Sequence, residues 1–196
     1  MAARPDVVVL GAGVSGLSTG IRLVESGARV LVRTAAPPAH TTSALAGAMV
    51  GPNLSPPGDI GLHPVRGPRI VVRNPGLDRF FMEAPMAPTW ASIFPHGDHV
   101  VLGGGQRRSD DTTPDPAEEA DVLARCVAIE PALAAAEVLD HRVGLRPGRA
   151  VPRVEAERRG DALVVHNYGH AGNGVMLSWG CAREAAALAL GGTPPA

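Results

Sequence analysis

A glycine-rich turn between a short apolar run and an amphipathic stretch limits the possible folds of this chain more than any other feature of its sequence. Residues 7–10 read VVVL, residues 11–16 read GAGVSG, and an amphipathic stretch follows from Leu17 to Glu25. This order predicts a strand, a tight turn and a helix, and Ala28 to Val32 supplies a second strand after Gly27. The pattern indicates an α/β protein that begins with a Rossmann-like dinucleotide-binding domain.

Each glycine of the turn has a physical role in a dinucleotide-binding site. Gly11 permits the tight turn, Gly13 lets the backbone approach a pyrophosphate, and Gly16 allows the helix to pack closely on the strand. The helix N-terminus then faces the anion. A glycine-rich loop that binds no nucleotide is the alternative. The candidate cofactor-binding residues here are Gly11, Ala12, Gly13, Val14, Ser15 and Gly16.

The end of the second predicted strand lacks the acidic residue that usually binds a ribose hydroxyl. Arg33 and Thr34 stand there, and no Asp or Glu occurs between Glu25 and Asp59. Ribose recognition must therefore come from neutral groups or water, or is absent. Arg33 could instead bind a 2′-phosphate, which would indicate NADP, or it could be a solvated arginine at the strand end.

A second glycine segment near the other end of the chain pairs with the first as the other half of one site. Residues 166–182 read HNYGHAGNGVMLSWGCA. Gly174 to Leu190 predicts a closing helix that ends at Gly191 and Gly192. Around Gly172 and Gly174, unpaired backbone N–H groups and the positive end of the helix dipole would face a bound anion.

A small, hydroxyl-bearing segment, HTTSALAGAM at residues 40–49, lets the chain lie flat against a large ligand. With this segment, the glycine turn, the motif Gly144-Leu145-Arg146-Pro147 and the stretch 166–180 in this order, the chain resembles the D-amino acid oxidase family of flavoproteins. The resemblance implies further cofactor contacts from Thr41, Thr42, Gly47, Ala48, Met49, Ala171, Gly172, Asn173, Gly174, Val175 and Met176.

The resemblance also implies an activity and two catalytic positions. The cofactor would be FAD, and the substrates a D-amino acid and molecular oxygen. Oxidation at Cα would give a 2-oxo acid, ammonia and hydrogen peroxide. Arg146 would hold the substrate carboxylate, and the backbone carbonyl of Gly172 would contact the substrate amine. His166 and His170 are expected to satisfy backbone groups beside the flavin rather than to act as bases.

From the residues alone, Arg146 has competing interpretations. A guanidinium fork matches a carboxylate with two parallel hydrogen bonds. Arg146 could also be a structural arginine paired with an internal acid, and Arg149 and Arg153 are nearby alternatives for the same role.

The chain departs from the family in its middle. In family members, on the order of a hundred residues, about a small domain, separate the segments matching 53–57 and 62–67, whereas here residues 58–61 join them. Ser92 stands where relatives place tyrosines, and Tyr168 is the only tyrosine. Three functions follow: an FAD-dependent oxidase of neutral or apolar D-amino acids, a catalytically inactive flavin-binding remnant, and an NADP-binding protein.

The expected organisation interleaves two domains. Residues 1–62 and 150–196 form a discontinuous, truncated FAD-binding domain, and residues 63–149 form a mainly antiparallel β substrate-binding domain. Asp115 is a plausible N-cap of the helix in the second domain. The elements expected there are strands at 70–72, 90–94 and 99–102, a turn at 95–98 and a helix at 117–127.

Composition and net charge limit the classes of partner that the chain can be expected to bind. The 45% hydrophobic content and net charge of −1 provide no basic field for nucleic acid. No run is long enough for a membrane span and no signal sequence opens the chain, so a cytoplasmic protein is expected. Cys126 and Cys181 lack metal-ligand spacing and are expected to be buried thiols, and no metal site is expected. Sheet edges uncovered by the deletion favour self-association, for example as a homodimer.

Overall fold

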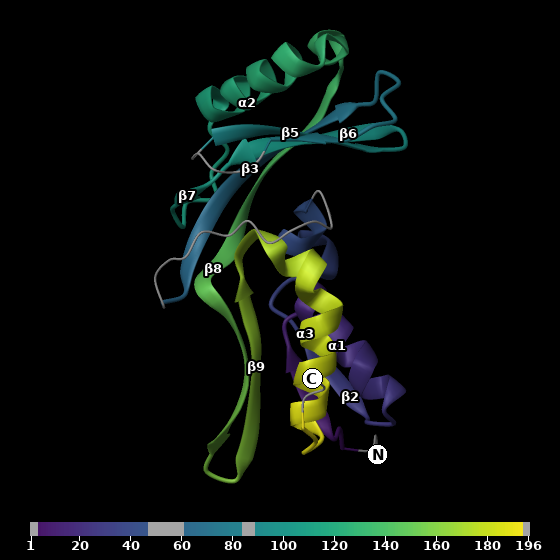
Figure 1. The fold of residues 1–196 in the computed structure, drawn as a ribbon, viewed down its shortest axis with the longest axis vertical. Coiled ribbons are helices and arrows are strands. Elements are labelled where there is room, and N and C mark those ends of the chain that lie inside the picture. Colours follow the sequence, from purple (N-terminus) through teal and green to yellow (C-terminus); the bar gives the residue numbers. More distant parts are fainter. Residues whose placement is uncertain (1–3, 47–60, 84–88, 194–196) are drawn as a thin grey trace. The chain divides into compact units, whose positions relative to one another are not determined.

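The computed structural model describes residues 4–46, 61–83 and 89–193, which form two compact units (Figure 1). The first unit combines residues 1–62 and 147–196, and the second holds residues 63–146. The second boundary between the units, between residues 146 and 147, falls inside strand β8 (Val138–Arg159). The sequence predicted this boundary three residues later, after residue 149. Pro147 and Gly148 follow the observed boundary directly, so a Pro-Gly pair of the kind that marks turns and loops lies there, although the strand continues through it.

The first unit opens with a strand, a helix and a parallel strand. These are β1 (Val7–Leu10), α1 (Val14–Glu25) and β2 (Val30–Arg33). The helix starts before the expected Leu17 because the turn already ends at Gly13. The strand–turn–helix–strand order expected from the glycine turn is therefore present.

Two short 3-10 helices follow β2, and the C-terminal part of the chain completes the unit. The 3-10 helices are η1 (Pro38–His40) and η2 (Thr42–Leu45). The C-terminal elements are β8, β9 (Ala162–His170), η4 (Ala171–Asn173) and α3 (Gly174–Ala189). The closing helix begins where expected, and Gly191, with φ of +77°, follows its end.

Helices α1 and α3 pack side by side in this unit (Figure 1). The hydroxyl of Ser18 on α1 donates to the Ser178 carbonyl of α3 at 3.3 Å. A small apolar core lies between the helices and β1, formed by Val9, Leu23 and Ala186. The beginning and the end of the chain are thus held together in one unit.

The second unit is a mainly antiparallel sheet. Its strands are β3 (His63–Arg73), β4 (Phe81–Met82), β5 (Thr89–His96), β6 (His99–Gly105) and β7 (Arg107–Arg108). The order is β4-β5-β6-β3, β8 continues the order beside β3, and β7 pairs with β3. The expected hairpin is present, but its turn is shorter than residues 95–98. His96 pairs with His99, and Gly97 at φ of +66° makes the reversal.

Helix α2 (Pro116–Ile129) covers this sheet and is followed by η3 (Pro131–Ala135). Asp115 caps α2 as expected, because its carboxylate accepts the Ala117 N–H at 3.0 Å. The core between helix and sheet consists of Ile70, Val72, Ala91, Ile93, Val100, Leu102, Val122, Cys126 and Leu133. The mixed α/β class with an antiparallel second unit therefore agrees with the sequence expectation.

The two cysteines differ in how deeply they are buried. Cys126 is fully buried in the core of the second unit, as expected, and burial raises the pKa of its thiol. Cys181 is only partly buried, which corrects the expectation for that residue: it lies on α3 near the exposed Gly180 and Trp179.

The helices give no sign of a membrane crossing. Within the described ranges, none combines the length and the apolar character that a bilayer span requires.

Candidate functional site

The glycine turn between β1 and α1 has the geometry that its sequence predicts. Gly11 adopts φ of +105°, a left-handed conformation that favours glycine, and its N–H donates to the Arg33 carbonyl at 2.7 Å. A Cβ at Gly16 would collide with the Gly11 carbonyl oxygen. Gly11 therefore makes the turn, and Gly16 lets helix α1 pack against it.

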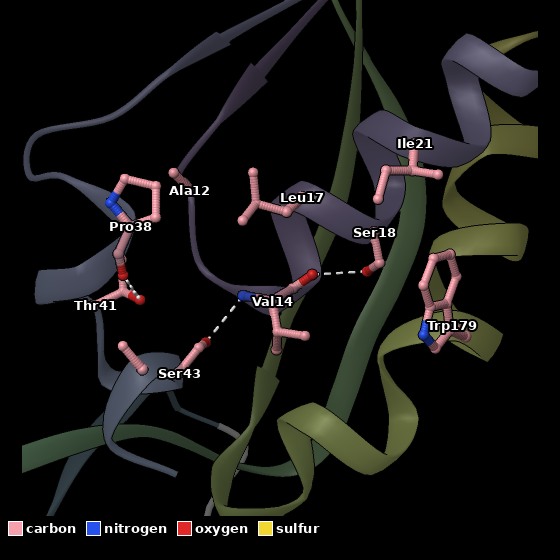
Figure 2. A pocket seen from close by; sticks show the side chains of 10 residues that line it. Ala12, Val14, Leu17, Ser18, Ile21, Pro38, Thr41, Ser43 and Trp179 are labelled. Carbon is pink, nitrogen blue, oxygen red and sulfur yellow. Dashed lines mark hydrogen bonds between the residues drawn. The ribbon is translucent and has the colours of Figure 1, made fainter. Parts of the chain in front are cut away.

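The start of helix α1 has a partner that sequence reasoning missed. The backbone N–H of Val14 donates to the Ser43 hydroxyl at 2.9 Å (Figure 2). Ser43 lies in η2, and a Cβ at Gly13 would come within 3.1 Å of its oxygen. The glycine at position 13 thus makes room for the Ser43 side chain. The only sequence signal was the hydroxyl-rich composition of the segment.

The other hydroxyl residues of this segment behave differently. Thr41 donates its hydroxyl to the Pro38 carbonyl at 2.7 Å, a bond within its own turn (Figure 2). Thr42 begins η2. The predicted contacts Gly47, Ala48 and Met49 lie outside the described residues.

A cavity adjoins the turn in the first unit. Its volume is about 320 Å³, at the lower end of the roughly 300–1,000 Å³ typical of ligand pockets, so it can hold part of a dinucleotide. Trp179 of α3 faces α1 across it (Figure 2). The lining residues are Ala12, Val14, Leu17, Ser18, Ile21, Pro38, Thr41, Ser43, Ala44 and Trp179.

The structure brings the two glycine segments together. A Cβ at Gly174, the first residue of α3, would lie 4.0 Å from Cγ1 of Val14, the first residue of α1. Two helix N-termini, each with backbone N–H groups that the helix itself cannot satisfy, therefore adjoin. Asn167 strengthens the connection, because its amide donates to the Thr19 hydroxyl at 3.0 Å.

The approach to α3 has an unusual backbone. Gly169 has φ of +86°, and Ala171 has φ of +48°, the only positive φ outside glycine among the described residues. Such strain concentrates at functional sites. Gly172 and Asn173 complete the short helix η4, and Val175 and Met176 lie in the first turn of α3.

The two histidines of this segment have different surroundings. His166 Nε2 lies 3.0 Å from Glu157 Oε1, and its ring packs edge-on against Tyr168. The His166 contact and Arg159 hold the pKa of Glu157 below its usual value. The contacts of His166 are with side chains of β8 and β9, and its expected role in satisfying backbone groups stays a prediction.

His170 differs from His166 in its burial and in the contacts of its ring Nε2. It is buried, burial lowers its pKa, and its Nε2 has no hydrogen-bond partner among the described residues. Its Cβ is 3.8 Å from the position that a Cβ of Gly174 would take. A polar atom left without a partner beside two helix N-termini, together with the glycine turn and the cavity, fits the phosphate-bearing part of a dinucleotide.

Arg146 lies in the second unit, on β8. Its Nη1 donates to the Gly105 carbonyl at 3.3 Å, and a Cβ at Gly67 would lie 2.6 Å from its Cζ. Partial burial lowers the pKa of Arg146. No carboxylate of the described residues pairs with it, so the alternative of an internal ion pair has no support there.

The neighbouring arginines have structural partners. Arg153 donates to Glu155 at 2.5 Å and to the Tyr168 hydroxyl at 3.1 Å. The Arg149 guanidinium lies 5.7 Å from the centre of the Tyr168 ring. Arg33, the residue that suggested NADP, is exposed at the end of β2. Among these arginines, Arg146 alone combines partial burial with the absence of an acidic or aromatic partner among the described residues.

Comparisons with known proteins show which family the chain is similar to. The model of the family described as FAD dependent oxidoreductase matches residues 6–62 and 52–188. A D-amino-acid oxidase of Rubrobacter xylanophilus is 49% identical over 133 residues, which cover 67% of this chain and 41% of that protein. A D-amino-acid oxidase of Streptomyces coelicolor is 42% identical over 134 residues, covering 67% and 42%.

A solved structure shares the fold. Glycine oxidase from Bacillus cereus superimposes with a TM-score of 0.59 and 28% identity, covering 67% of this chain and 36% of that one. The chain thus spans about two fifths of the length of the curated relatives it matches. Because the family model matches most of its residues, the chain belongs to the FAD-dependent oxidoreductase family that includes the D-amino acid oxidases.

Proposed function

We propose that this chain binds FAD through its first unit and oxidises a D-amino acid to a 2-oxo acid, with release of ammonia and hydrogen peroxide. The observation that carries the proposal is the meeting of the two glycine segments at the starts of α1 and α3. The resemblance to D-amino acid oxidases supports the substrate class. The first unit is then the cofactor-binding domain and the second the substrate-binding domain.

In the first unit, the residues of the glycine turn would hold the pyrophosphate. Ser43 already positions the turn by accepting the Val14 N–H, and Gly11 and Gly16 give it its shape. At the start of α3, residues 171–176 would place backbone N–H groups and a positive dipole end toward the flavin ring. Thr41, Thr42 and residues 47–49 are proposed to lie along the cofactor, as the family resemblance implies.

Bound FAD would supply the two-electron oxidation of the substrate Cα–N bond, with molecular oxygen as the final acceptor. The chain must orient the substrate. Arg146 would bind its carboxylate through two parallel hydrogen bonds, for which the guanidinium retains donors beyond the one used by Gly105. The Gly172 carbonyl would accept a hydrogen bond from the substrate amine. No side-chain base is needed when that amine is neutral.

A flavin-binding remnant without turnover is the second candidate, because β1 and β2 leave apolar side chains exposed. Self-association through these strands, as a homodimer, is a further expectation. The FAD-dependent family favours FAD over NADP.

An absorption spectrum of the purified, desalted protein tests the proposal, before and after addition of FAD and then anaerobically with a panel of D-amino acids that includes D-alanine and D-aspartate. Retained flavin that bleaches supports the oxidase. Flavin that stays oxidised identifies the remnant, and absence of flavin contradicts both. Thermal stabilisation by NADP instead of FAD would revive the third function.

The variant Arg146→Leu checks the substrate anchor. Loss of a charge-assisted carboxylate contact should raise KM about 10- to 100-fold. Arg79→Leu is the matched control, because Arg79 lies in the same unit with its side chain 94% exposed. Unchanged kinetics in Arg146→Leu would contradict the assignment.

A further inference from the structure

A second arginine lies beside Arg146 on the sheet of the second unit. Gly67 and Arg69 are two residues apart on β3, so they share one face of the sheet. Arg69 pairs with Gly103 of β6, and a Cβ at Gly103 would lie 3.1 Å from the Arg69 Cζ. The Arg69 guanidinium therefore lies over Gly103, as the Arg146 guanidinium lies over Gly67.

The two glycines make room for the two cations. Gly67 and Gly103 are diagonal neighbours of an antiparallel pair, which are roughly 7–8 Å apart. One small molecule with two carboxylates can reach two guanidiniums that lie over backbone positions this far apart. A side chain at either glycine would displace the arginine above it, but only at the flexible end of that arginine.

The two guanidinium groups also affect each other electrostatically. Burial and the charge of Arg146 together lower the pKa of Arg69 to about 9. Arg69 and Arg146 are both only partly buried. Two like charges held this close repel each other, and a bound dianion would relieve the repulsion.

A polar group from a third strand borders the same face. Ser92 of β5 also pairs with Gly103, and its Oγ would lie 3.3 Å from a Cβ at that position. Ser92 is buried, and its hydroxyl and the Arg69 guanidinium both lie next to Gly103. Two cations and a hydroxyl on one sheet face are suited to oxygen-rich anions.

We propose that Arg69 is a specificity-determining residue, and that Arg69 and Arg146 together select a D-amino acid with a second carboxylate in its side chain. This inference rests on the proposed function, because Arg146 takes the α-carboxylate. Arg69 then binds the side-chain carboxylate, with Ser92 beside it. The preference replaces the neutral or apolar substrates expected from the sequence, which places no second cation near the site.

Binding of redox-inert acids tests the site without turnover. Calorimetry on the full chain would compare succinate, which has two carboxylates, with propionate, which has one. Arg69→Gln should weaken succinate binding about 10- to 100-fold and change propionate binding less than about twofold. The control Arg79→Gln should change neither. Equal affinities of wild type and Arg69→Gln for succinate would overturn the proposal, as would equal losses for both acids.

A second variant tests whether the weaker succinate binding of Arg69→Gln comes only from the loss of a positive charge. Gly103→Ala keeps both arginines but displaces the Arg69 guanidinium, so it should also weaken succinate selectively. Inorganic sulfate that binds as tightly as succinate would show a general anion site and overturn the dicarboxylate selection.

Turnover separates this inference from the proposed function. The holoenzyme should reduce its flavin with a higher kcat/KM for D-aspartate than for D-alanine, and Arg69→Gln should reverse that order. Flavin reduction with an unchanged preference in Arg69→Gln would remove the inference and leave the oxidase standing. Succinate binding that depends on Arg69 in a chain that never reduces flavin would remove the oxidase and leave the anion site standing.

Discussion

The two units bury their apolar side chains to very different extents. In the second unit, Val72, Val100 and Leu102 are all 0% exposed beneath helix α2. In the first unit, Val8 is 47% and Leu10 80% exposed. The second unit thus has a closed core between a helix and a sheet, whereas one face of the β1–β2 pair meets solvent.

This difference follows from the kind of sheet. An antiparallel sheet needs a cover on only one face, and α2 provides it. Parallel strands are normally buried on both faces, but β1 and β2 form a two-stranded sheet with α1 packed against it. We infer that the second unit is stable by itself, whereas the first gains stability from a ligand or a partner surface.

The largest expected effect is the loss of a buried charge pair in the second unit. Arg66 on β3 is 0% exposed and donates to Glu118 Oε2 at 2.7 Å and to the Asp111 carbonyl at 2.7 Å. Arg66→Met should lower the free energy of unfolding by about 3–5 kcal/mol, because Glu118 loses its closer partner and keeps only the 3.9 Å contact with Arg107. Urea denaturation measures it. Arg73→Met, which removes a surface pair with Glu137, should cost about 0–1 kcal/mol, and equal losses would contradict the closed core.

Replacing one leucine by alanine in each unit compares the burial of apolar side chains in the two units directly. Leu102 pairs with Ile70 and Ile93 in the core, so Leu102→Ala should cost about 2–5 kcal/mol of unfolding free energy. Leu10→Ala should stay within about 0.5 kcal/mol, because its side chain is already in solvent. Both values come from denaturation curves. A large loss in Leu10→Ala would show that the β1 face is covered in solution.

Two glycines of the first unit make a matched pair. Gly16→Ala should destabilise by about 1–3 kcal/mol and weaken FAD binding, since its Cβ meets the Gly11 carbonyl. Gly180, exposed on α3, has open space around it, so Gly180→Ala should stabilise by roughly 0.5–1 kcal/mol. Melting temperatures of the two variants, measured with and without FAD, report the changes in stability and in FAD binding. If Gly16→Ala keeps wild-type FAD affinity, the glycine turn does not hold the cofactor.

The smallest expected effect concerns an exposed ion pair between the starts of β1 and β2. Arg29 donates to Asp6 through its backbone and its guanidinium, which lowers the pKa of Asp6 to about 2. A carboxyl whose pKa is lower in the folded state stabilises above its unfolded pKa of 3.8, and this stabilisation is lost as pH falls through about 2. An NMR titration should show the low pKa, and Asp6→Asn should remove that part of the acid dependence. A pKa near 3.8 would mean that the pair does not form.

Local signals predicted the parts of the fold that local residues determine. The glycine turn predicted β1 and α1, Asp115 predicted the start of α2, and Gly174 predicted the start of α3. In each case the signal lies within a few residues of the element that it specifies. The position of the Arg146 guanidinium over Gly67, by contrast, required the structure.

The missed features depend on residues far apart in the chain. Strand β8 contains Pro147, Gly148 and Pro152, residue types depleted in strands, and it forms because β9 and β3 pair with it. The Ser43 contact joins two segments of the first unit through a tertiary hydrogen bond. The Arg69 site likewise combines β3, β6 and β8, which no local pattern indicates.

Hydrogen exchange of the full chain with and without FAD shows whether the adjoining glycine segments of the first unit hold the cofactor. This cofactor assignment predicts that FAD slows exchange in residues 11–17 and 171–176 and leaves exchange in β5 and β6 of the second unit unchanged. Unchanged exchange in residues 11–17 and 171–176 at saturating FAD, or protection confined to the second unit, would contradict it.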